Sequence, residues 1–501
     1  MEISFENKVT GAYREVSHQV KRIQESAESV VPDTNDDIGK IASVQTSLLL
    51  KSKDLTSRGV LVTGEINAML LYITENESAV SFVRLSKSFE IEYEMGEVDA
   101  DTVAQINLAV TNTEARILNP RKVSVTVEVS GELSCYRPET VNIETTLPEA
   151  TAGQGLHLKV ETAEAVIANA VCEKTFAINE QYVFPGGKPS PAQLVSQNVD
   201  FCVTETEIIG SRIIIKGSVN MAVCYLSHEV NYPVRTEFSS PFSQIIDIGE
   251  ENMDSCSAVI ELTSAYYDLI ETISGEKAMD AELHAVVQVV SRRKQSVSFV
   301  SDVYSNRMPA QCSVQGSQIN TVSDMLRSKL SADERINIAD DCADVLSVFT
   351  SASQPTASQG KLSTAVSLDV IYRSKSGTLS SARRLINLEG ECLSVPSRLL
   401  GFRLSDVYLR PDGRAIDCHI TVDVSYQSSA SMELARVVAV GLDEEAMYDQ
   451  MELPTVTLVR TDQETLWELA KRYHSSIEGI SAMNDLSDGI SGKLLLIPKE
   501  K

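Results

Sequence analysis

The sequence predicts a mostly β protein with three sandwich-like β-rich domains in tandem, followed by a small strand-helix-helix-strand domain. Three observations support this prediction. Val, Ile, Thr and Ser are abundant while aromatic residues make up only 5% of the 501 residues, which favours strands over helical bundles. A sequence pattern recurs at the spacing of whole domains, and the last 47 residues differ in charge from the rest. A chain of this length should hold three or four domains.

The recurring pattern is a nine-residue segment that ends in tyrosine. Residues 64–72 match residues 217–225 with Gly, Asn and Tyr in register, and residues 364–372 keep the apolar pair and the Tyr. The tyrosines are about 150 residues apart, so each unit is a domain and not a short solenoid repeat. Apolar residues at every second position downstream of each Tyr predict half-buried strands. These residues are Val123, Val125, Val127 and Val129; Ala281, Leu283, Ala285, Val287 and Val289; and Ile416, Cys418, Ile420, Val422 and Val424.

The repeats give a set of domain boundaries. We expect β-rich domains at residues 31–150, 175–300 and 325–430, a linker at 431–454 and the small domain at 455–498. Residues 1–30 are expected to form an N-terminal amphipathic helix, because Val16, Val20 and Ile23 recur with polar residues between them.

The C-terminal segment has the signals of two short helices between two strands. Thr465 and Glu468 form a capping box, in which each side chain satisfies a free backbone N–H at the start of a helix. Leu466, Leu469, Ala470 and Tyr473 then follow at the spacing of one helical face. A second helix over residues 476–483 ends at Asn484. Six bases and seven acids give this segment a net charge of −1, so the preceding domains carry nearly all of the chain's −26.

Charge and cysteine usage narrow the function classes. A net charge of −26 disfavours binding to nucleic acid and to anionic membranes, since both need clustered Lys and Arg. The nine cysteines are scattered without a C-x-x-C pair, which indicates reduced thiols. The first ten residues lack the pattern of a signal peptide, and no run of 18 apolar residues occurs. We therefore expect a cytosolic protein with no membrane insertion.

No catalytic motif stands out. The chain has no G-x-x-x-x-G-K-[ST], H-E-x-x-H or G-x-S-x-G sequence, and its six histidines occur singly. A hydrolase would need a carboxylate pair, and nothing in so acidic a chain specifies one. We expect no enzymatic activity, no cofactor and no metal site.

One acidic stretch has two interpretations. Glu90, Glu92 and Glu94 alternate with apolar residues, so a strand here would bury one face and raise three carboxylates from the other. That face is either a solvated edge, where charge prevents aggregation, or a docking surface for a basic partner.

The sequence resembles two known families at specific residues. The tail resembles a LysM domain in T-L-W-E-L-A-K-R-Y (465–473), I-x-x-I-x-x-M-N-x-L (477–486) and L-L-L-I-P (494–498). The three repeats ahead of it are similar to the SPOCS domains of the clostridial SipL family. This resemblance implies a non-enzymatic spore-envelope scaffold of the mother cell, recruited to the forespore surface. It also implies that the LysM domain binds the coat basement-layer ATPase SpoIVA, and that other spore-envelope proteins are partners.

The tail departs from the LysM pattern before its first helix. LysM domains usually carry Gly-Asp-Thr there, and this chain has Gln463, Glu464 and Thr465. If the family glycine serves a positive φ or the close approach of a sugar, Gln463 is unfavourable on both counts. This leaves at most weak glycan binding, and LysM-mediated recognition of peptidoglycan or other N-acetylglucosamine polymers is the alternative function.

Trp467 is the leading candidate for partner contact. It is the only Trp in the chain, and it lies one residue, about 100° of helical rotation, from the buried Leu466 stripe. We expect it to be only partly covered and to contact a partner, with local packing as the alternative. The expected partner-binding surface consists of Glu464, Thr465, Trp467, Lys471 and Asn484.

Overall fold

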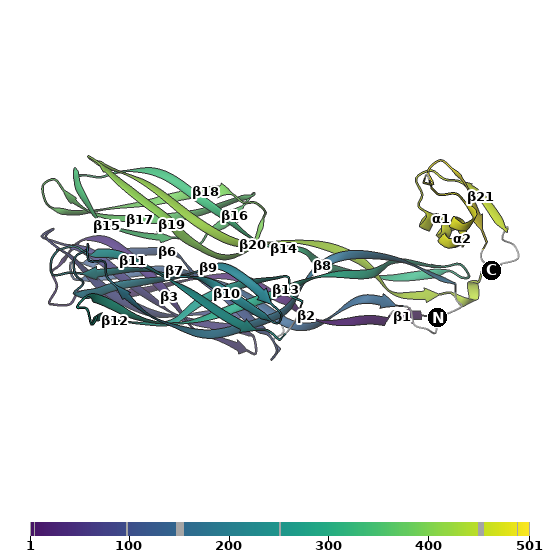
Figure 1. The fold of residues 1–501 in the computed structure, drawn as a ribbon, viewed down its shortest axis with the longest axis horizontal. Coiled ribbons are helices and arrows are strands. Elements are labelled where there is room, and N and C mark those ends of the chain that lie inside the picture. Colours follow the sequence, from purple (N-terminus) through teal and green to yellow (C-terminus); the bar gives the residue numbers. More distant parts are fainter. Residues whose placement is uncertain are drawn as a thin grey trace.

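The computed structural model describes residues 2–4, 6–96, 99–146, 155–249, 252–448, 455–487 and 489–499. These residues form antiparallel sheets, with helical segments only near the C-terminal end, so the prediction of a mostly β protein is confirmed. Figure 1 shows an elongated molecule with a broad body, a narrow stalk of long strands, and a small module at the stalk tip. We call these parts the body, the stalk and the C-terminal module (residues 455–499).

The body and stalk are built from three units with the same topology. A long first strand is followed by a three-stranded meander, whose first strand is split into β15 and β16 in unit 3, and then by a hairpin whose second strand pairs with the first strand. Each unit is therefore a sandwich of two sheets with an apolar core between them. Unit 1 contains β2 (Glu6–Val30), β3 (Ile38–Thr56), β4 (Gly59–Thr74), β5 (Val80–Glu94), β6 (Val103–Asn119) and β7 (Lys122–Thr146). Unit 2 contains β8 (Leu156–Val183), β9 (Gln193–Ile209), β10 (Arg212–Leu226), β11 (Val234–Asp247), β12 (Ser255–Glu271) and β13 (Lys277–Ser305). Unit 3 contains β14 (Ala310–Asn337), β15 (Cys342–Ala352), β16 (Thr356–Ser358), β17 (Lys361–Ser374), β18 (Leu379–Glu391), β19 (Pro396–Asp412) and β20 (Ala415–Leu442).

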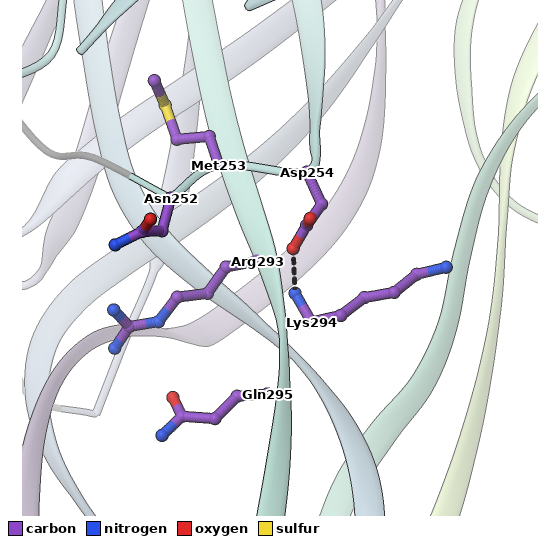
Figure 2. Close-up of a pocket in the computed structure, with 6 residues that line it drawn as sticks. All are labelled: Asn252, Met253, Asp254, Arg293, Lys294 and Gln295. Atoms are coloured by element: carbon purple, nitrogen blue, oxygen red, sulfur yellow. Dashed lines mark hydrogen bonds between the residues drawn. The ribbon is translucent and has the colours of Figure 1, made fainter. Parts of the chain in front are cut away.

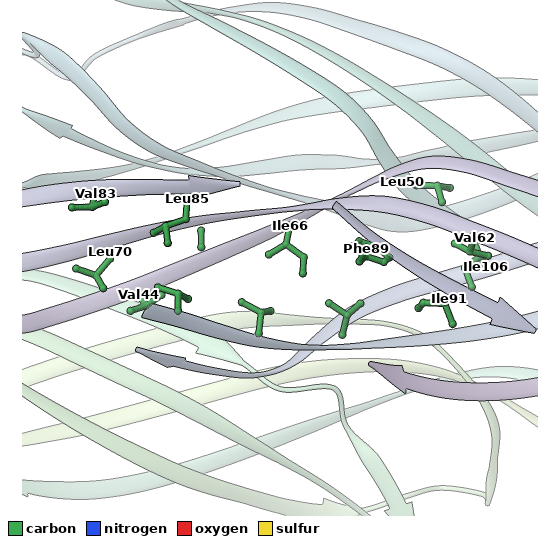
Figure 3. Close-up of a cluster of buried hydrophobic side chains, with 14 of the residues drawn as sticks. Val44, Leu50, Val62, Ile66, Leu70, Val83, Leu85, Phe89, Ile91 and Ile106 are labelled. Carbon is green, nitrogen blue, oxygen red and sulfur yellow. The ribbon is translucent and has the colours of Figure 1, made fainter. Parts of the chain in front are cut away.

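The apolar residues of the predicted alternating strands lie in the cores of the three units. Every apolar residue named for β7, β13 and β20 is buried, and Figure 3 shows the core of unit 1, where side chains from both sheets meet. Tyr72, Tyr225 and Tyr372 lie at equivalent positions of the central strands β4, β10 and β17 and are at most 1% exposed. The hydroxyl of Tyr72 donates to the carbonyl of Asp36, and that of Tyr225 donates to the carbonyl of Pro189. These tyrosines recur because the same core position recurs.

The glycine of the repeated segment has a steric cause. Gly64 is paired across the ladder with Phe89, and Gly217 with Phe242. A Cβ at Gly64 would lie 2.3 Å from the Phe89 ring, and one at Gly217 would lie 2.7 Å from the Phe242 ring. In unit 3 the corresponding residue is Thr364, and the residue opposite is a leucine. Glycine therefore occurs at this position in the two units whose neighbouring strand places a phenylalanine ring against it.

The alternation predicted for the acidic stretch is confirmed. Glu90, Glu92 and Glu94 are exposed on β5, while Phe89 and the other apolar residues between them are buried. β5 is an edge strand of the sheet β3-β4-β5. The charges therefore line the edge strand of a sheet, where they disfavour pairing with another chain.

The prediction of an N-terminal amphipathic helix is wrong. Residues 6–30 form β2, which pairs with β7 from Glu6 opposite Thr146 to Val30 opposite Lys122. The spacing of Val16, Val20 and Ile23 fits a helix, yet Val20 is 53% exposed, so the three do not share a buried face. A long partner strand satisfies the backbone of this segment, and this non-local pairing overrides the local periodicity.

The expected boundaries cut through strands. The segments left between the expected domains contain the ends of β8, β13 and β14, and the expected linker at 431–454 contains the end of β20. Together with the outer parts of β2 and β7, these strand ends extend beyond the sandwiches as the stalk (Figure 1). β1 (Glu2–Ser4) pairs with β20 at the stalk tip. Val300, Val303, Val437 and Val440 form an apolar core there with Ile3.

Buried charged side chains connect unit 3 to unit 1. The side chain of Arg398 on β19 is only 9% exposed, and its guanidinium donates to the Tyr136 hydroxyl at 2.7 Å. It also pairs with Glu15 at 2.5 Å and lies 3.9 Å from Glu132, which is 7% exposed. Glu132 also contacts His18 Nε2 at 2.9 Å. These groups fix unit 3 against β2 and β7.

A second polar contact connects unit 1 to unit 2. Lys53 on β3 donates to Glu173 at 2.6 Å and to Gln288 at 2.8 Å. Glu261 on β12 accepts the backbone N–H of Leu108 at 2.9 Å. Burial raises the pKa of Glu261 to about 8, so this carboxyl is protonated at neutral pH. The three units are thus joined by specific buried contacts and form one body.

Candidate functional site

The C-terminal module has the predicted strand-helix-helix-strand order. It consists of β21 (Val456–Arg460), α1 (Leu466–Arg472), α2 (Ile477–Met483) and β22 (Leu494–Pro498). The predicted capping box is present: the Thr465 hydroxyl accepts the Glu468 N–H, and the Glu468 carboxylate accepts the Thr465 N–H at 2.7 Å. Leu469 and Ala470 are fully buried as expected, and they pack with residues of α2 and β22.

The expectation that Trp467 is only partly covered is wrong. Its side chain is 9% exposed and belongs to the apolar cluster of the module. The additional cover comes from β13 at the stalk tip. Trp467 Nε1 donates to Asp302 Oδ2 at 2.8 Å, and the Tyr304 ring stands edge-to-face on the indole with 4.9 Å between centroids. A helical wheel could not show that the stalk covers this side of α1.

The other expected site residues divide into two groups. Lys471, one turn after Trp467, also contacts the stalk: its Nζ is 2.7 Å from both carboxylate oxygens of Asp302. Glu464 forms an ion pair with Arg472 of the same module. Trp467 and Lys471 therefore converge on one carboxylate of the stalk, whereas Glu464 contacts its own helix.

Thr465 and Asn484 support the fold of the module. Thr465 is the exposed N-cap of α1. The Asn484 side chain donates to the carbonyls of Ile480 and Leu496, each at 2.7 Å, and accepts the Leu496 N–H at 2.7 Å. Asn484 thus ties the end of α2 to β22.

The junction between module and stalk contains two residues that the sequence did not indicate. Asp302 and Tyr304 lie on the last part of β13, and the Tyr304 hydroxyl donates to the Ser475 carbonyl at 2.7 Å. The ring of His157 on β8 stacks on that of Tyr304, with 4.8 Å between the ring centroids. Tyr448, in the segment after β20, stacks on His474 at 3.8 Å. No local pattern in the sequence links residues 302–304 to the tail.

Two titratable groups of this junction have shifted pKa values. Burial raises the pKa of Asp302, but the hydrogen bonds from Lys471 and Trp467 outweigh it, and the net effect is a lowered pKa. Burial lowers the pKa of His474. At neutral pH the junction therefore holds an ionised carboxylate against the Lys471 ammonium.

A surface depression in unit 2 differs from this junction in that it is open to solvent. Figure 2 shows it beside Asp254, whose carboxylate accepts the backbone N–H of Lys294. It is open and polar, with a volume of about 580 Å³. Its lining residues are Asn252, Met253, Asp254, Arg293, Lys294 and Gln295. This open and polar depression lacks the concave, mostly apolar lining that is usual for small-molecule sites.

The described ranges contain neither a metal-binding cluster nor a membrane-spanning helix. No group of three or more His, Cys, Asp or Glu there could hold a metal ion. None of the described helices has the length and apolar character needed to cross a bilayer. All nine cysteines are free, and burial raises the pKa of Cys135 and Cys172 to about 11, which makes poor nucleophiles of these two thiols.

One comparison with known proteins gave a match. Residues 192–270 match the family model described as "SipL, SPOCS domain". The matched segment runs from the start of β9 nearly to the end of β12 and includes the Tyr225 repeat. No curated protein and no solved structure matches the chain. The chain is thus similar to the SPOCS domain of SipL over about half of unit 2, and this match supports a SipL-like protein.

Proposed function

We propose that the chain is a non-enzymatic scaffold of spore-envelope assembly, a cytoplasmic protein of the mother cell that is recruited to the forespore surface. The observation that carries this proposal is the match of residues 192–270 to the SPOCS domain of SipL. The shared topology of the three units supports it, because units 1 and 3 then count as further SPOCS-type repeats. Other spore-envelope proteins are the proposed partners of these units.

The C-terminal module is proposed to be a LysM domain that binds a SpoIVA-like basement-layer ATPase. Its strand-helix-helix-strand order and its place at the stalk tip, away from the body, support a tethering role (Figure 1). The proposed binding surface comprises Glu464, Thr465, Lys471 and Asn484. Trp467 joins this surface, and Lys471 becomes free to bind a partner, only after the module has left the stalk, because both side chains contact Asp302.

Two experiments test this function. A fluorescent fusion should collect at the forespore surface during sporulation, and removal of residues 455–501 should release it into the mother-cell cytoplasm. Purified full chain should bind the purified basement-layer ATPase, and the truncated chain should not. A truncated chain that still binds the ATPase and still localises would contradict the role of the module.

Recognition of peptidoglycan or other N-acetylglucosamine polymers is the second candidate, favoured by the LysM-like order of elements. Gln463 is not among the described residues with positive φ, so its replacement of the family glycine causes no backbone strain. The remaining objection is the bulk of Gln463 where a sugar would approach. Calorimetric titration with chitin oligomers separates the candidates, because micromolar binding would support the glycan function.

A further inference from the structure

We propose that the Trp467–Lys471 face of α1 is a binding site for a carboxylate followed two residues later by an aromatic ring on an extended strand. In the free chain the stalk fills this site with Asp302 and Tyr304. Binding of a separate partner here rests on the proposed function: a protein that docks on this face must present the same chemistry and displace the stalk.

The carboxylate subsite is made by one helical face. Trp467 and Lys471 are four residues apart on α1, so their side chains lie next to each other. Asp302 receives the indole N–H at 2.8 Å and the ammonium at 2.7 Å on both oxygens. The side chain of Asp302 is 30% exposed and that of Lys471 45%, so the pair is partly shielded from water. Charge-assisted hydrogen bonds of this kind select a carboxylate over a neutral amide.

The aromatic subsite lies beside it. Tyr304 is 4% exposed and contacts Trp467 edge-to-face, with 70° between the two ring planes. Its hydroxyl donates to the Ser475 carbonyl, which follows α1 in the chain. Residues two apart on a strand point to the same side, so one extended segment can fill both subsites. An aromatic pair of this geometry contributes beyond the area that it buries.

An irregularity in the stalk helps to present these two residues. The β13–β8 ladder runs without a shift from Arg292 to Val300 and then shifts register between Val300 and Asp302. Such bulges add a residue to one strand and re-aim the side chains that follow. Asp302 and Tyr304 follow this bulge directly and meet the module.

The stalk segment with Asp302 and Tyr304 acts as an intramolecular ligand of the C-terminal module. Module and stalk belong to one chain, and only residues 443–455 separate β20 from β21, so Asp302 and Tyr304 act on the module at an effective concentration that does not fall on dilution. A trans ligand with the same two groups competes against this concentration. A variant in which Asp302 or Tyr304 no longer fills the site should therefore bind such a ligand more tightly than the original chain does.

The single Trp makes the site directly observable in the full chain. Asp302→Asn should shift the fluorescence emission of Trp467 to longer wavelength and raise its acrylamide quenching constant severalfold. Tyr304→Phe removes only the hydroxyl bond and should cause a smaller change in the same direction. Asp280→Asn is the matched control: Asp280 lies on the same strand and is bonded to Gln181, far from the module in the ladder. Unchanged emission in both Asp302→Asn and Tyr304→Phe would overturn the proposal.

A peptide tests the ligand chemistry. The probe is a synthetic peptide with the sequence of residues 299–306, added to the Asp302→Asn chain. It should restore the original emission, and a peptide with the Asp and Tyr positions exchanged should not. Restoration by both peptides, or by neither, would overturn the assigned chemistry.

A binding assay with the basement-layer ATPase separates this inference from the proposed function. Tighter binding by Asp302→Asn than by the original chain supports both. Equal binding by the two chains overturns the competition while leaving the proposed function intact. If neither chain binds the ATPase but the fluorescence changes are as expected, the proposed partner is refuted. The contact between the stalk and the module within one chain then still stands.

Discussion

Replacing Arg398 with alanine should strongly destabilise the body. The side chain of Arg398 is 9% exposed and supplies the guanidinium that neutralises Glu15 and Glu132 between units 1 and 3. After its removal, the Glu132 side chain, 7% exposed, loses the guanidinium and keeps its contact with His18. Loss of one member of a buried charged group typically costs about 3–5 kcal/mol, because the remaining charge stays desolvated. This is a large fraction of a stability of about 5–15 kcal/mol.

Equilibrium unfolding in urea, followed by far-UV circular dichroism, measures this loss. Arg398→Lys should give an intermediate midpoint, because it keeps the charge but loses the planar fork that reaches several acceptors. Arg335→Ala is the matched control, since Arg335 is an exposed arginine of unit 3 whose partners Asp412 and Asp417 are also exposed. The reasoning is refuted if Arg398→Ala unfolds at the same urea concentration as Arg335→Ala.

Three further predictions follow from the cores and the unit contacts. Because burial raises the pKa of Glu261 from 4.5 to about 8, the native state keeps a proton that the unfolded state has released. The free energy of unfolding should therefore fall by about 1.4 kcal/mol per pH unit between these values, and Glu261→Gln should flatten that dependence in urea titrations across the range. Tyr225→Phe should cost about 1 kcal/mol through the lost bond to Pro189, whereas Tyr372→Phe, where no hydroxyl bond exists among the described contacts, should have little effect on the unfolding midpoint. Gly217→Ala should lower the melting temperature, because its Cβ would lie 2.2 Å from the Cys202 carbonyl oxygen, and Gly401→Ala, with open space around it, is the control that should not.

The cores were predictable from sequence because they depend on local alternation. Val123 to Val129, and their counterparts in the other two units, show which face of each strand is buried without any knowledge of the partner strand. The spacing of the three tyrosines likewise reveals the repeat, since an equivalent core position needs a similar residue. The capping box of α1 was predictable for the same reason, because its donors and acceptors are three residues apart.

The stalk and the buried site of Trp467 were not predictable because they depend on distant contacts. β2 is a strand only because β7, more than ninety residues later, pairs with it along its length. Trp467 meets Asp302 across 165 residues of sequence, and a helical wheel contains no information about such a contact. Local periodicity shows which face of an element is apolar, but not which other part of the chain covers a second face.

The route of the chain through the stalk bears on how such a protein can grow during evolution. Each unit enters the body along its first strand and leaves along its last, and these two strands end side by side at the stalk tip. A tandem gene duplication can therefore add a whole unit at a single loop of the tip without rerouting any existing strand. The new unit only has to acquire side chains, such as Arg398, that fit its neighbours. Copy number and the position of the C-terminal module can thus change independently.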